Sequence, residues 1–244
     1  MTGRFEGRVA LLTGAASGIG RATAERLASE GASVFGFDLN ASGLAAVSCL
    51  AGSFVGDVSS RDACFAAVDA CVSSLGRLDV LGNIAGIARA EHFGSLTEAA
   101  YRQMMGVNID GYVWMSQAAI PHLLSAEGNI VNIASNAGLM GQAYTVTYCV
   151  SKGAVVQLTR ALAMEYVKTP LRVNAIAPGG VETALYANFA IPEDVDWKLL
   201  TRYTGLRGAA APSDIAGLFA FVASDEGRNI DGAILSTDGA LTAG

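Results

Sequence analysis

Short apolar runs alternate along the chain with longer segments in which apolar residues recur every three or four positions. The runs have the length and composition of strands buried on both faces, and the longer segments are typical of helices packed on one side. Strands are expected over 8–13, 33–38, 53–56, 78–81, 129–134, 171–176 and 233–235. Helices are expected over 21–30, 42–50, 61–75, 97–124 and 212–223, and in a segment that carries Tyr148 and ends near Lys168. Such an alternation predicts a parallel sheet with right-handed crossovers.

A glycine-rich turn, Gly14-Ala15-Ala16-Ser17-Gly18-Ile19-Gly20, joins the first strand to the first helix. Glycines let the backbone approach a pyrophosphate, and a helix N-terminus offers free N–H groups to the anion. The second strand ends at Asp38, near the distance from this turn at which a carboxylate meets the ribose hydroxyls of NAD. Because Ser17 and Leu39 stand where a basic residue would hold NADP, the sequence favours NAD. The alternative is an ordinary turn aspartate.

Tyr148 and Lys152 are four positions apart and share one face of a helix. A nearby ammonium favours phenolate over phenol and would lower the pKa of Tyr148 toward that of a general base. Ser135 ends the fifth strand, and ligands of parallel sheets bind beyond the carboxyl ends of the strands. Asn108, followed by Gly111, predicts a local kink within 97–124.

Composition narrows the classes of function. Of the 244 residues 52% are hydrophobic and 16% charged, and the net charge of −6 argues against nucleic acid or an anionic membrane as partner. The cysteines Cys49, Cys64, Cys71 and Cys149 form no C-x-x-C pair, and the histidines His92 and His122 have no metal-site spacing. We therefore expect free thiols and no metal. Without a leader or a membrane-spanning run, a cytoplasmic protein of one domain, 1–244, is predicted.

The glycine turn from Thr13 to Gly20, Asn83-Ile84-Ala85-Gly86, Ser135, Tyr148 with Lys152, and Pro178-Gly179 follow one another in the order of a known pattern. It closely resembles the classical short-chain dehydrogenase/reductase (SDR) family over nearly the full chain. The resemblance implies a Rossmann-type, doubly wound, seven-stranded parallel sheet with three helices on each face. It also implies a homotetramer and hydride transfer between NAD(H) and a secondary alcohol or ketone.

The resemblance also implies a role for each matching position. Tyr148 would be the general acid/base, Lys152 would lower its pKa and hold the nicotinamide ribose, and Ser135 would bind the reacting oxygen. Asn108 would hold a water that links Lys152 to solvent. Contacts to the cofactor are expected from Gly14, Ser17, Gly18, Ile19, Gly20, Asp38, Leu39, Asp57, Val58, Asn83, Ala85, Gly86, Tyr148, Lys152, Pro178, Gly179, Val181 and Thr183. For Asp57, capping of the next helix is the equal alternative.

Departures from the family pattern are Ile84, the lead into the last helix at 208–212, Asp231-Gly232 and Ala240, which leave the details of assembly open. The irregular stretch 181–211 is expected to be a substrate lid. The substrate pocket is expected to draw on Ala88, His92, Asn136, Leu139, Gln142, Thr145 and Gly179, with Arg89 as a possible cation. A polyol, an alicyclic alcohol, a steroid or a small hydroxy compound would fit.

Two other functions remain open. An NADPH-dependent 3-oxoacyl-thioester reductase is the enzymatic alternative, against which Asp38 speaks. A dinucleotide-binding sensor or scaffold without catalysis is the other, made less favourable by the intact set of Asn108, Ser135, Tyr148 and Lys152. Tyr112, Trp114 and Met115 are interpreted as core or subunit-interface residues.

Overall fold

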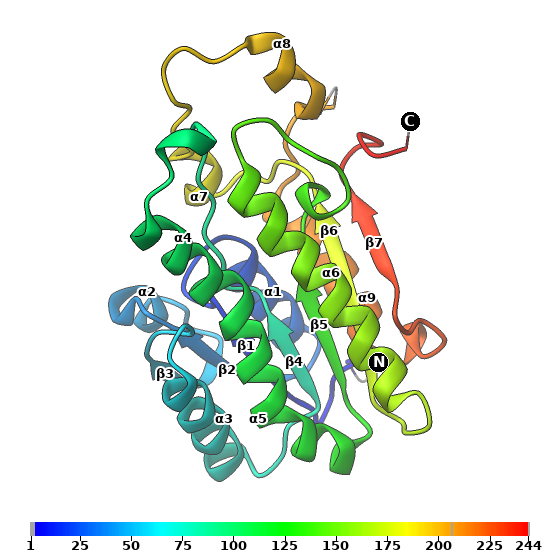
Figure 1. Ribbon diagram of the computed structural model, residues 1–244. Helices are drawn as coiled ribbons and strands as arrows, with labels where there is room; N and C mark the ends of the chain where they lie inside the picture. Colours follow the sequence, from blue (N-terminus) through cyan, green and yellow to red (C-terminus); the bar gives the residue numbers. More distant parts are fainter. Residues whose placement is uncertain (1–2, 206, 244) are drawn as a thin grey trace.

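All seven strands of the computed structural model, which describes residues 3–205 and 207–243, lie in one parallel sheet (Figure 1). Their order is β3-β2-β1-β4-β5-β6-β7, so the chain starts in the middle, runs to one edge and crosses back. This confirms the doubly wound sheet, whose switch point lies between β1 and β4. The strands are β1 (Val9–Thr13), β2 (Ser33–Asp38), β3 (Leu50–Val55), β4 (Val80–Asn83), β5 (Asn129–Ile133), β6 (Arg172–Pro178) and β7 (Ile234–Thr237).

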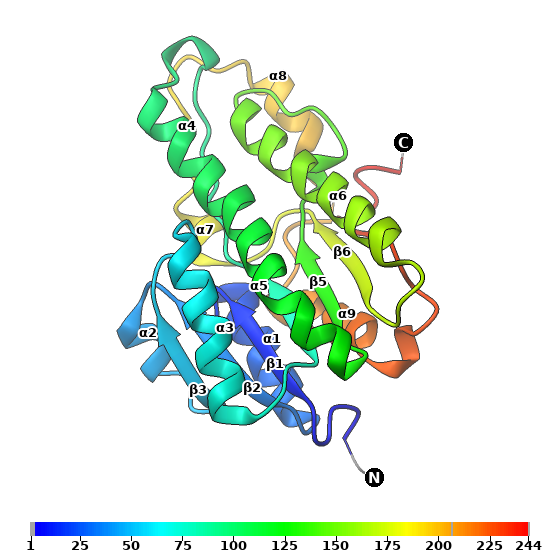
Figure 2. The ribbon, with the colours of Figure 1, turned by 60° about the horizontal axis from the view of Figure 1, so that its bottom comes forward.

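Helices cover both faces of the sheet (Figures 1 and 2). One face packs α3 (Arg61–Leu75), α5 (Gly111–Ala126) and α6 (Val146–Tyr166), and the other packs α1 (Gly18–Ser29), α9 (Pro212–Ala223) and the short α2 (Ala41–Ala45). Leu27 and Phe219 are fully buried on the second face, and Leu123 is fully buried on the first. The structure is therefore the expected three-layer α/β/α arrangement.

The predicted helix over 42–50 is wrong in its second half. Asn40 caps α2 by accepting a hydrogen bond from the Gly43 N–H at 2.9 Å, but the helix ends at Ala45. Leu50 already pairs with Val34 in the sheet. Short apolar segments have no period long enough to separate a strand from a helix, so the sheet contact decides here.

The expected kink within 97–124 is a π-helical turn. α4 (Glu98–Met105) passes into η2 (Gly106–Asp110), which has π geometry, and then into α5 without a break. Asn108 lies in this turn and is fully buried. Turns of this kind inside α-helices are frequent at functional sites.

The long loops gather where the strands end. α7 (Ala184–Ala187) and α8 (Trp197–Leu200) lie in the stretch expected to be a lid, above the arrowheads in Figure 1. The remaining short helices are η1 (Phe93–Ser95), η3 (Asn136–Gly138), η4 (Thr201–Tyr203) and η5 (Asp225–Gly227).

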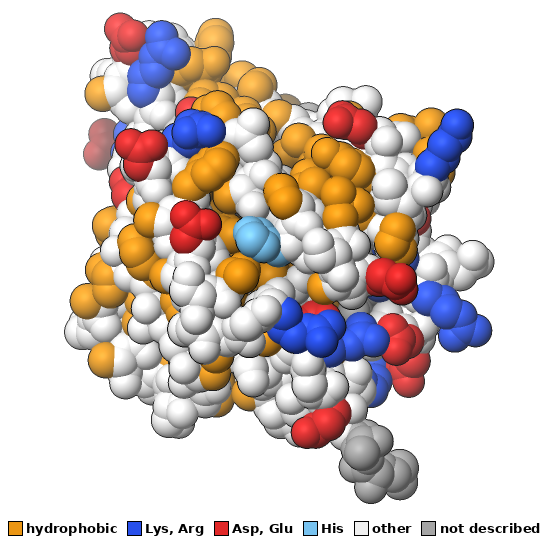
Figure 3. Space-filling model, turned by 90° about the horizontal axis from the view of Figure 1, so that it is seen from below, with side chains coloured by type: hydrophobic (Ala, Val, Ile, Leu, Met, Phe, Trp, Pro, Cys, Tyr) orange, Lys and Arg blue, Asp and Glu red, His pale blue; other side chains and the backbone are white. Residues whose placement is uncertain are grey.

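Acidic and basic side chains lie side by side on the face seen from below (Figure 3). Arg4 pairs with Glu30 at 2.6 Å and Arg8 with Asp225 at 2.7 Å, which ties the start of the chain to the ends of α1 and α9. In the described part of the chain, no helix is long and apolar enough to cross a membrane. Nor do these residues include a group of three or more side chains suited to a metal ion.

Candidate active site

The glycine turn brings the start of α1 against the end of β1. Gly14 and Gly18 have φ of +68° and +51°, a region that favours glycine. A Cβ at Gly20 would lie 2.0 Å from the Gly14 carbonyl oxygen, so only glycine allows this close approach. The Ser17 side chain does not cap the start of the 12-residue helix α1, and the first residues of this helix, Gly18, Ile19 and Gly20, line a cleft, as an anion site requires.

A cleft, here called the glycine-turn cleft, opens in front of this turn. Most of the expected cofactor residues line it. Those residues are Gly14, Ser17, Gly18, Ile19, Gly20, Asp38, Leu39, Asp57, Val58, Ala85, Gly86 and Thr183. Arg102, on α4, also lines it; sequence reasoning missed this residue, because only the fold brings α4 to the cleft.

Asp38 joins the glycine turn to the end of β2. Its carboxylate accepts hydrogen bonds from the Ala16 N–H at 3.0 Å and the Asn40 N–H at 2.9 Å. Asp57 accepts from the Ser59 N–H at 2.8 Å, whereas the cap of α3 is Ser60, which accepts from the Ala63 N–H. Of the two roles weighed for Asp57, capping α3 is therefore wrong, and the residue lies in the cleft wall.

Asn83 is the expected cofactor residue that the fold keeps out of both cavities. Its side chain is 1% exposed and donates hydrogen bonds to Asn132 at 2.9 Å and Ser116 at 3.2 Å. It braces β4 against β5, as the resemblance implied, and its contact with a cofactor stays a prediction. Thr13 likewise joins the end of β1 to the loop after β4, because its hydroxyl accepts hydrogen bonds from the N–H groups of Ile84 and Ala85.

A second cavity, here called the Tyr148 pocket, continues from the first and shares residues such as Ile19, Gly86 and Thr183 with it. Ser135, Tyr148 and Lys152 line it, together with the expected cofactor residues Pro178, Gly179 and Val181. Of the expected substrate residues, Ala88, Asn136, Gln142 and Thr145 line it too. The fold thus brings the end of β5, the start of α6 and the end of β6 to one place.

Lys152 is buried, and its ammonium lies near two groups of other elements and one aromatic ring of its own helix, α6. Its Nζ donates hydrogen bonds to the Ile133 carbonyl at 2.8 Å and to the Tyr112 hydroxyl at 3.3 Å. It lies 6.0 Å from the centre of the Tyr148 ring. Burial lowers the pKa of Lys152 to about 7. Tyr112, expected only in the core or an interface, is therefore part of the site, and the signal was its position one turn after Asn108.

The pKa of Tyr148 moves opposite to the expectation from its spacing with Lys152. Burial raises the pKa of the phenol, and the Ser135 hydroxyl beside it acts in the lowering direction. Desolvation disfavours the charged form of both groups, so the buried ammonium does not dominate. A lower pKa for Tyr148 therefore needs a further positive charge in the pocket.

Asn108 lies behind the pocket and lines neither cavity. Its Oδ1 accepts from the Ile87 N–H at 2.8 Å, and its Nδ2 donates to the Ile87 carbonyl at 2.8 Å and the Ser151 hydroxyl at 3.0 Å. It thus fixes the loop after β4 against α6, next to Lys152. Its expected role in holding a water stays a prediction.

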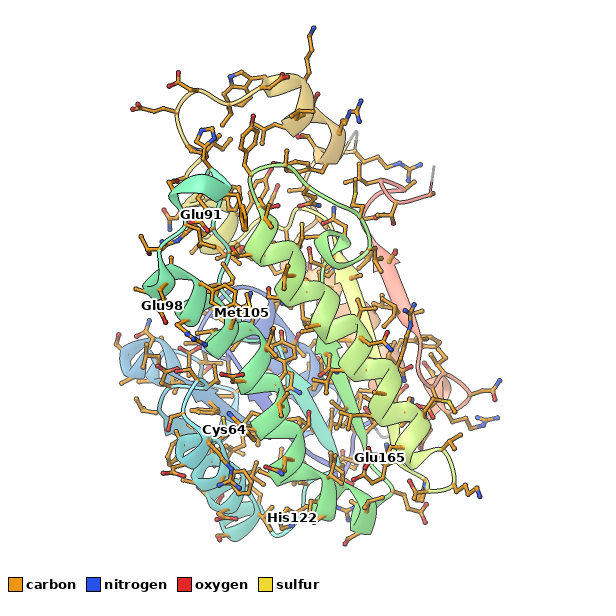
Figure 4. All side chains as sticks on the ribbon, viewed as in Figure 1. Cys64, Glu91, Glu98, Met105, His122 and Glu165 are labelled. Atoms are coloured by element: carbon orange, nitrogen blue, oxygen red, sulfur yellow. The ribbon has the colours of Figure 1, made fainter. Side chains whose placement is uncertain are left out.

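His92, Leu139 and Arg89 are not in the walls of the Tyr148 pocket as described. Nε2 of His92 lies 2.8 Å from the Glu193 carbonyl oxygen, and its ring packs on that of Tyr144 with centroids 5.3 Å apart. His92 therefore contacts the stretch expected to be a lid. Figure 4 shows His122 at the far end of α5, away from the strand ends, and Glu91 near the start of α6.

Comparisons with known proteins match most of the chain. A family model described as short chain dehydrogenase matches residues 8–193. The chain is 39% identical to a meso-2,3-butanediol dehydrogenase of Serratia marcescens, over 98% of this chain and 96% of that protein.

Solved structures agree closely with the fold. A 3-ketoacyl-(acyl-carrier-protein) reductase of Brucella melitensis complexed with NADH has a TM-score of 0.89 and 30% identity, covering 98% of this chain and 99% of that one. A short chain dehydrogenase of Burkholderia cenocepacia J2315 in complex with NADP has a TM-score of 0.88 and 32% identity, with the same coverage. The matched family model, the relative and the shared fold together make this chain a member of the short-chain dehydrogenase/reductase family of oxidoreductases.

Proposed function

We propose that the protein transfers a hydride between NAD(H) and a secondary alcohol or ketone, with Tyr148 as the general acid/base. The observation that carries the proposal is the continuity of the two cavities. One is walled by the glycine turn and Asp38, the other by Ser135, Tyr148 and Lys152, and they share Ile19, Gly86 and Thr183. A dinucleotide laid along the first would reach the second.

Residues of the glycine-turn cleft fit a dinucleotide. The positive φ of Gly14 and Gly18 and the free N–H groups at the start of α1 suit a pyrophosphate. Asp38 suits the ribose hydroxyls and would repel a 2′-phosphate. Arg102 is largely exposed and lies 3.4 Å from Glu98, which offsets its charge. These features support NAD, although relatives in the family bind either cofactor.

The chain's own residues would handle the proton. Nicotinamide supplies the site that accepts or gives the hydride, and its positive charge favours phenolate in a neighbouring tyrosine. During oxidation the Tyr148 oxygen takes the hydroxyl proton of the alcohol. The Ser135 hydroxyl, which donates to Asn136 Oδ1 in this structure, turns to donate a hydrogen bond to the same oxygen, and the Lys152 ammonium stabilises the phenolate.

Further expectations belong to the same proposal. The stretch 181–211 acts as a lid over a single domain, held by the contact of His92 with Glu193 and by the Asp196 N–H, which donates to the Tyr144 hydroxyl at 2.8 Å. A homotetramer in the cytoplasm stays a prediction. The name of the Serratia relative points to alcohols that carry a second hydroxyl as the first compounds to try.

Initial rates with a panel of secondary alcohols test the function. We expect reduction of NAD with at least one alcohol, at a kcat/KM at least ten times that with NADP, a difference of about 1.4 kcal/mol. Faster oxidation of NADPH with a 3-oxoacyl thioester would support the reductase alternative instead. Tight binding of NAD without any turnover would favour the non-catalytic alternative.

A further inference from the structure

We infer that Asn136 and Gln142 form a subsite for a second hydroxyl, so that the substrate is a vicinal diol and the product an α-hydroxyketone. The inference rests on the proposed function and names the class of alcohol. It assigns a task to two amide side chains that the proton and hydride chemistry leaves unused.

The side-chain oxygen of Asn136, Oδ1, already has hydrogen-bond partners inside the protein. Asn136 follows Ser135 directly and is 6% exposed. Its Oδ1 accepts two hydrogen bonds, one from the Ser135 hydroxyl at 3.1 Å and one from Gln142 Nε2 at 3.1 Å. These bonds fix the two amide groups against each other and beside the residue that binds the reacting oxygen.

One donor and one acceptor are left over. Asn136 Nδ2 and Gln142 Oε1 make no hydrogen bond to other described residues, and neither belongs to the buried side-chain atoms that lack a partner there. Both residues line the Tyr148 pocket, so the unused donor and acceptor are open to it. A hydroxyl group both accepts and donates, which matches this pair.

The surroundings favour a neutral compound. Lys152 is the one charged side chain among the described residues that line the pocket, and two of its three N–H donors bind Ile133 and Tyr112. Leu185, Tyr186 and Phe189 add an apolar wall from the stretch 181–211. A carboxylate substrate would find no second cation among these residues, whereas a diol with a small carbon skeleton would find polar partners on one side.

Ser135 and Asn136 are neighbours, and their closeness indicates how far apart the two hydroxyls of the substrate lie. The Ser135 hydroxyl, which binds the reacting oxygen in the proposed mechanism, is one hydrogen bond away from the Asn136 amide. A hydroxyl on the carbon next to the reacting carbon would therefore come close to this amide. A mono-alcohol would leave the amide pair without its partner, and sites built to bind a hydroxyl discriminate strongly against compounds that lack it.

The test compares kcat/KM for meso-2,3-butanediol and 2-butanol with NAD in the wild type, in Gln142→Met and in Asn136→Asp. Gln142→Met keeps the length of the side chain but removes the acceptor, together with the hydrogen bond that Nε2 donates to Asn136. Asn136→Asp keeps the oxygen that Ser135 binds but removes the donor. We expect the wild type to favour the diol by at least tenfold and each variant to lower the diol-to-mono-alcohol ratio by about tenfold. The lower kcat/KM of each variant with the diol should come mainly from a higher KM.

Gln157→Met is the matched control, because Gln157 is exposed on the same helix α6. Its ratio should equal that of the wild type, and thermal melts of all variants check folding. Equal losses for both alcohols would overturn the subsite while leaving the proposed dehydrogenase standing. A wild type that reduces NAD with neither these nor any other secondary alcohol would overturn the function itself, and the subsite with it.

Discussion

Lys152 Nζ lies 3.3 Å from the Tyr112 hydroxyl oxygen, and both groups donate a hydrogen bond to the carbonyl of Ile133, at 2.8 and 2.9 Å. The triangle joins α6, α5 and the end of β5, and both side chains are almost fully buried. The ammonium is therefore held in place by three elements, not merely by its helical spacing from Tyr148. This arrangement gives Tyr112 a positioning role in the proposed reaction.

Tyr112→Phe tests that role, because it removes the hydroxyl and keeps the ring. We expect kcat to fall by about an order of magnitude, with unchanged affinity for NAD, and the free energy of unfolding to fall by about 1 kcal/mol. The pH profile of kcat/KM should also shift, because the ammonium loses a hydrogen-bond acceptor. Tyr166→Phe, at the end of α6, is the control for removal of a tyrosine hydroxyl elsewhere in the protein. A loss of stability with an unshifted pH profile would limit Tyr112 to a structural role.

Lys152 also predicts a dependence of stability on pH. Its pKa in the folded protein is about 7, below the ordinary value of 10.5, so the unfolded chain binds more protons between these values. Stability therefore rises with pH over this window, and the penalty of the buried charge is full below pH 7. From neutral pH to two units above it, the gain should be about 2 kcal/mol relative to Lys152→Met, as measured by urea unfolding. An equal dependence in both proteins would contradict the burial of a titrating ammonium.

Asp38 predicts the choice of cofactor. Asp38→Asn keeps an oxygen for the N–H groups of Ala16 and Asn40 but removes the charge that would repel a 2′-phosphate. We expect the ratio of kcat/KM with NADP to that with NAD to rise at least tenfold, or about 1.4 kcal/mol. Asp69→Asn, on the exposed side of α3, is the matched control. An unchanged ratio would remove Asp38 from cofactor selection.

Asn108 predicts a loss of stability. Asn108→Ala would strip the N–H and carbonyl of Ile87 and the Ser151 hydroxyl of their amide partner. We expect the free energy of unfolding to fall by about 2 kcal/mol, because polar groups in the interior lose their hydrogen bonds. Urea unfolding measures the change. Activity lost at wild-type stability would instead assign Asn108 to the chemistry alone.

Helix bounds were predicted correctly where the sequence carries a capping or terminating residue. α3 has the expected bounds because Ser60 caps its start and Gly76, with φ of +80°, ends it. α9 begins at Pro212 as expected, since proline suits the first helical position. α2 has no comparable signal at its end, and its predicted length was wrong.

Most residues of the candidate site could also be predicted from the sequence. Glycine turns and polar residues at strand ends converge on one edge of a parallel sheet. Long-range packing decided the rest. The contact of Lys152 with Tyr112 and the approach of Arg102 to the cleft need the fold. Burial, which no spacing reveals, sets the direction of the pKa of Tyr148. The interior position of Asn83 likewise depends on its partners in β5 and α5.

The central claim is that the Tyr148 oxygen exchanges the proton of the substrate hydroxyl. The direct measurement is kcat of Tyr148→Phe with NAD and the best alcohol of the panel, alongside the dissociation constant of NAD. We predict that kcat falls by about a thousandfold, within the range that general acid–base groups contribute, while NAD binds as in the wild type. A variant that keeps most of its kcat would contradict the account.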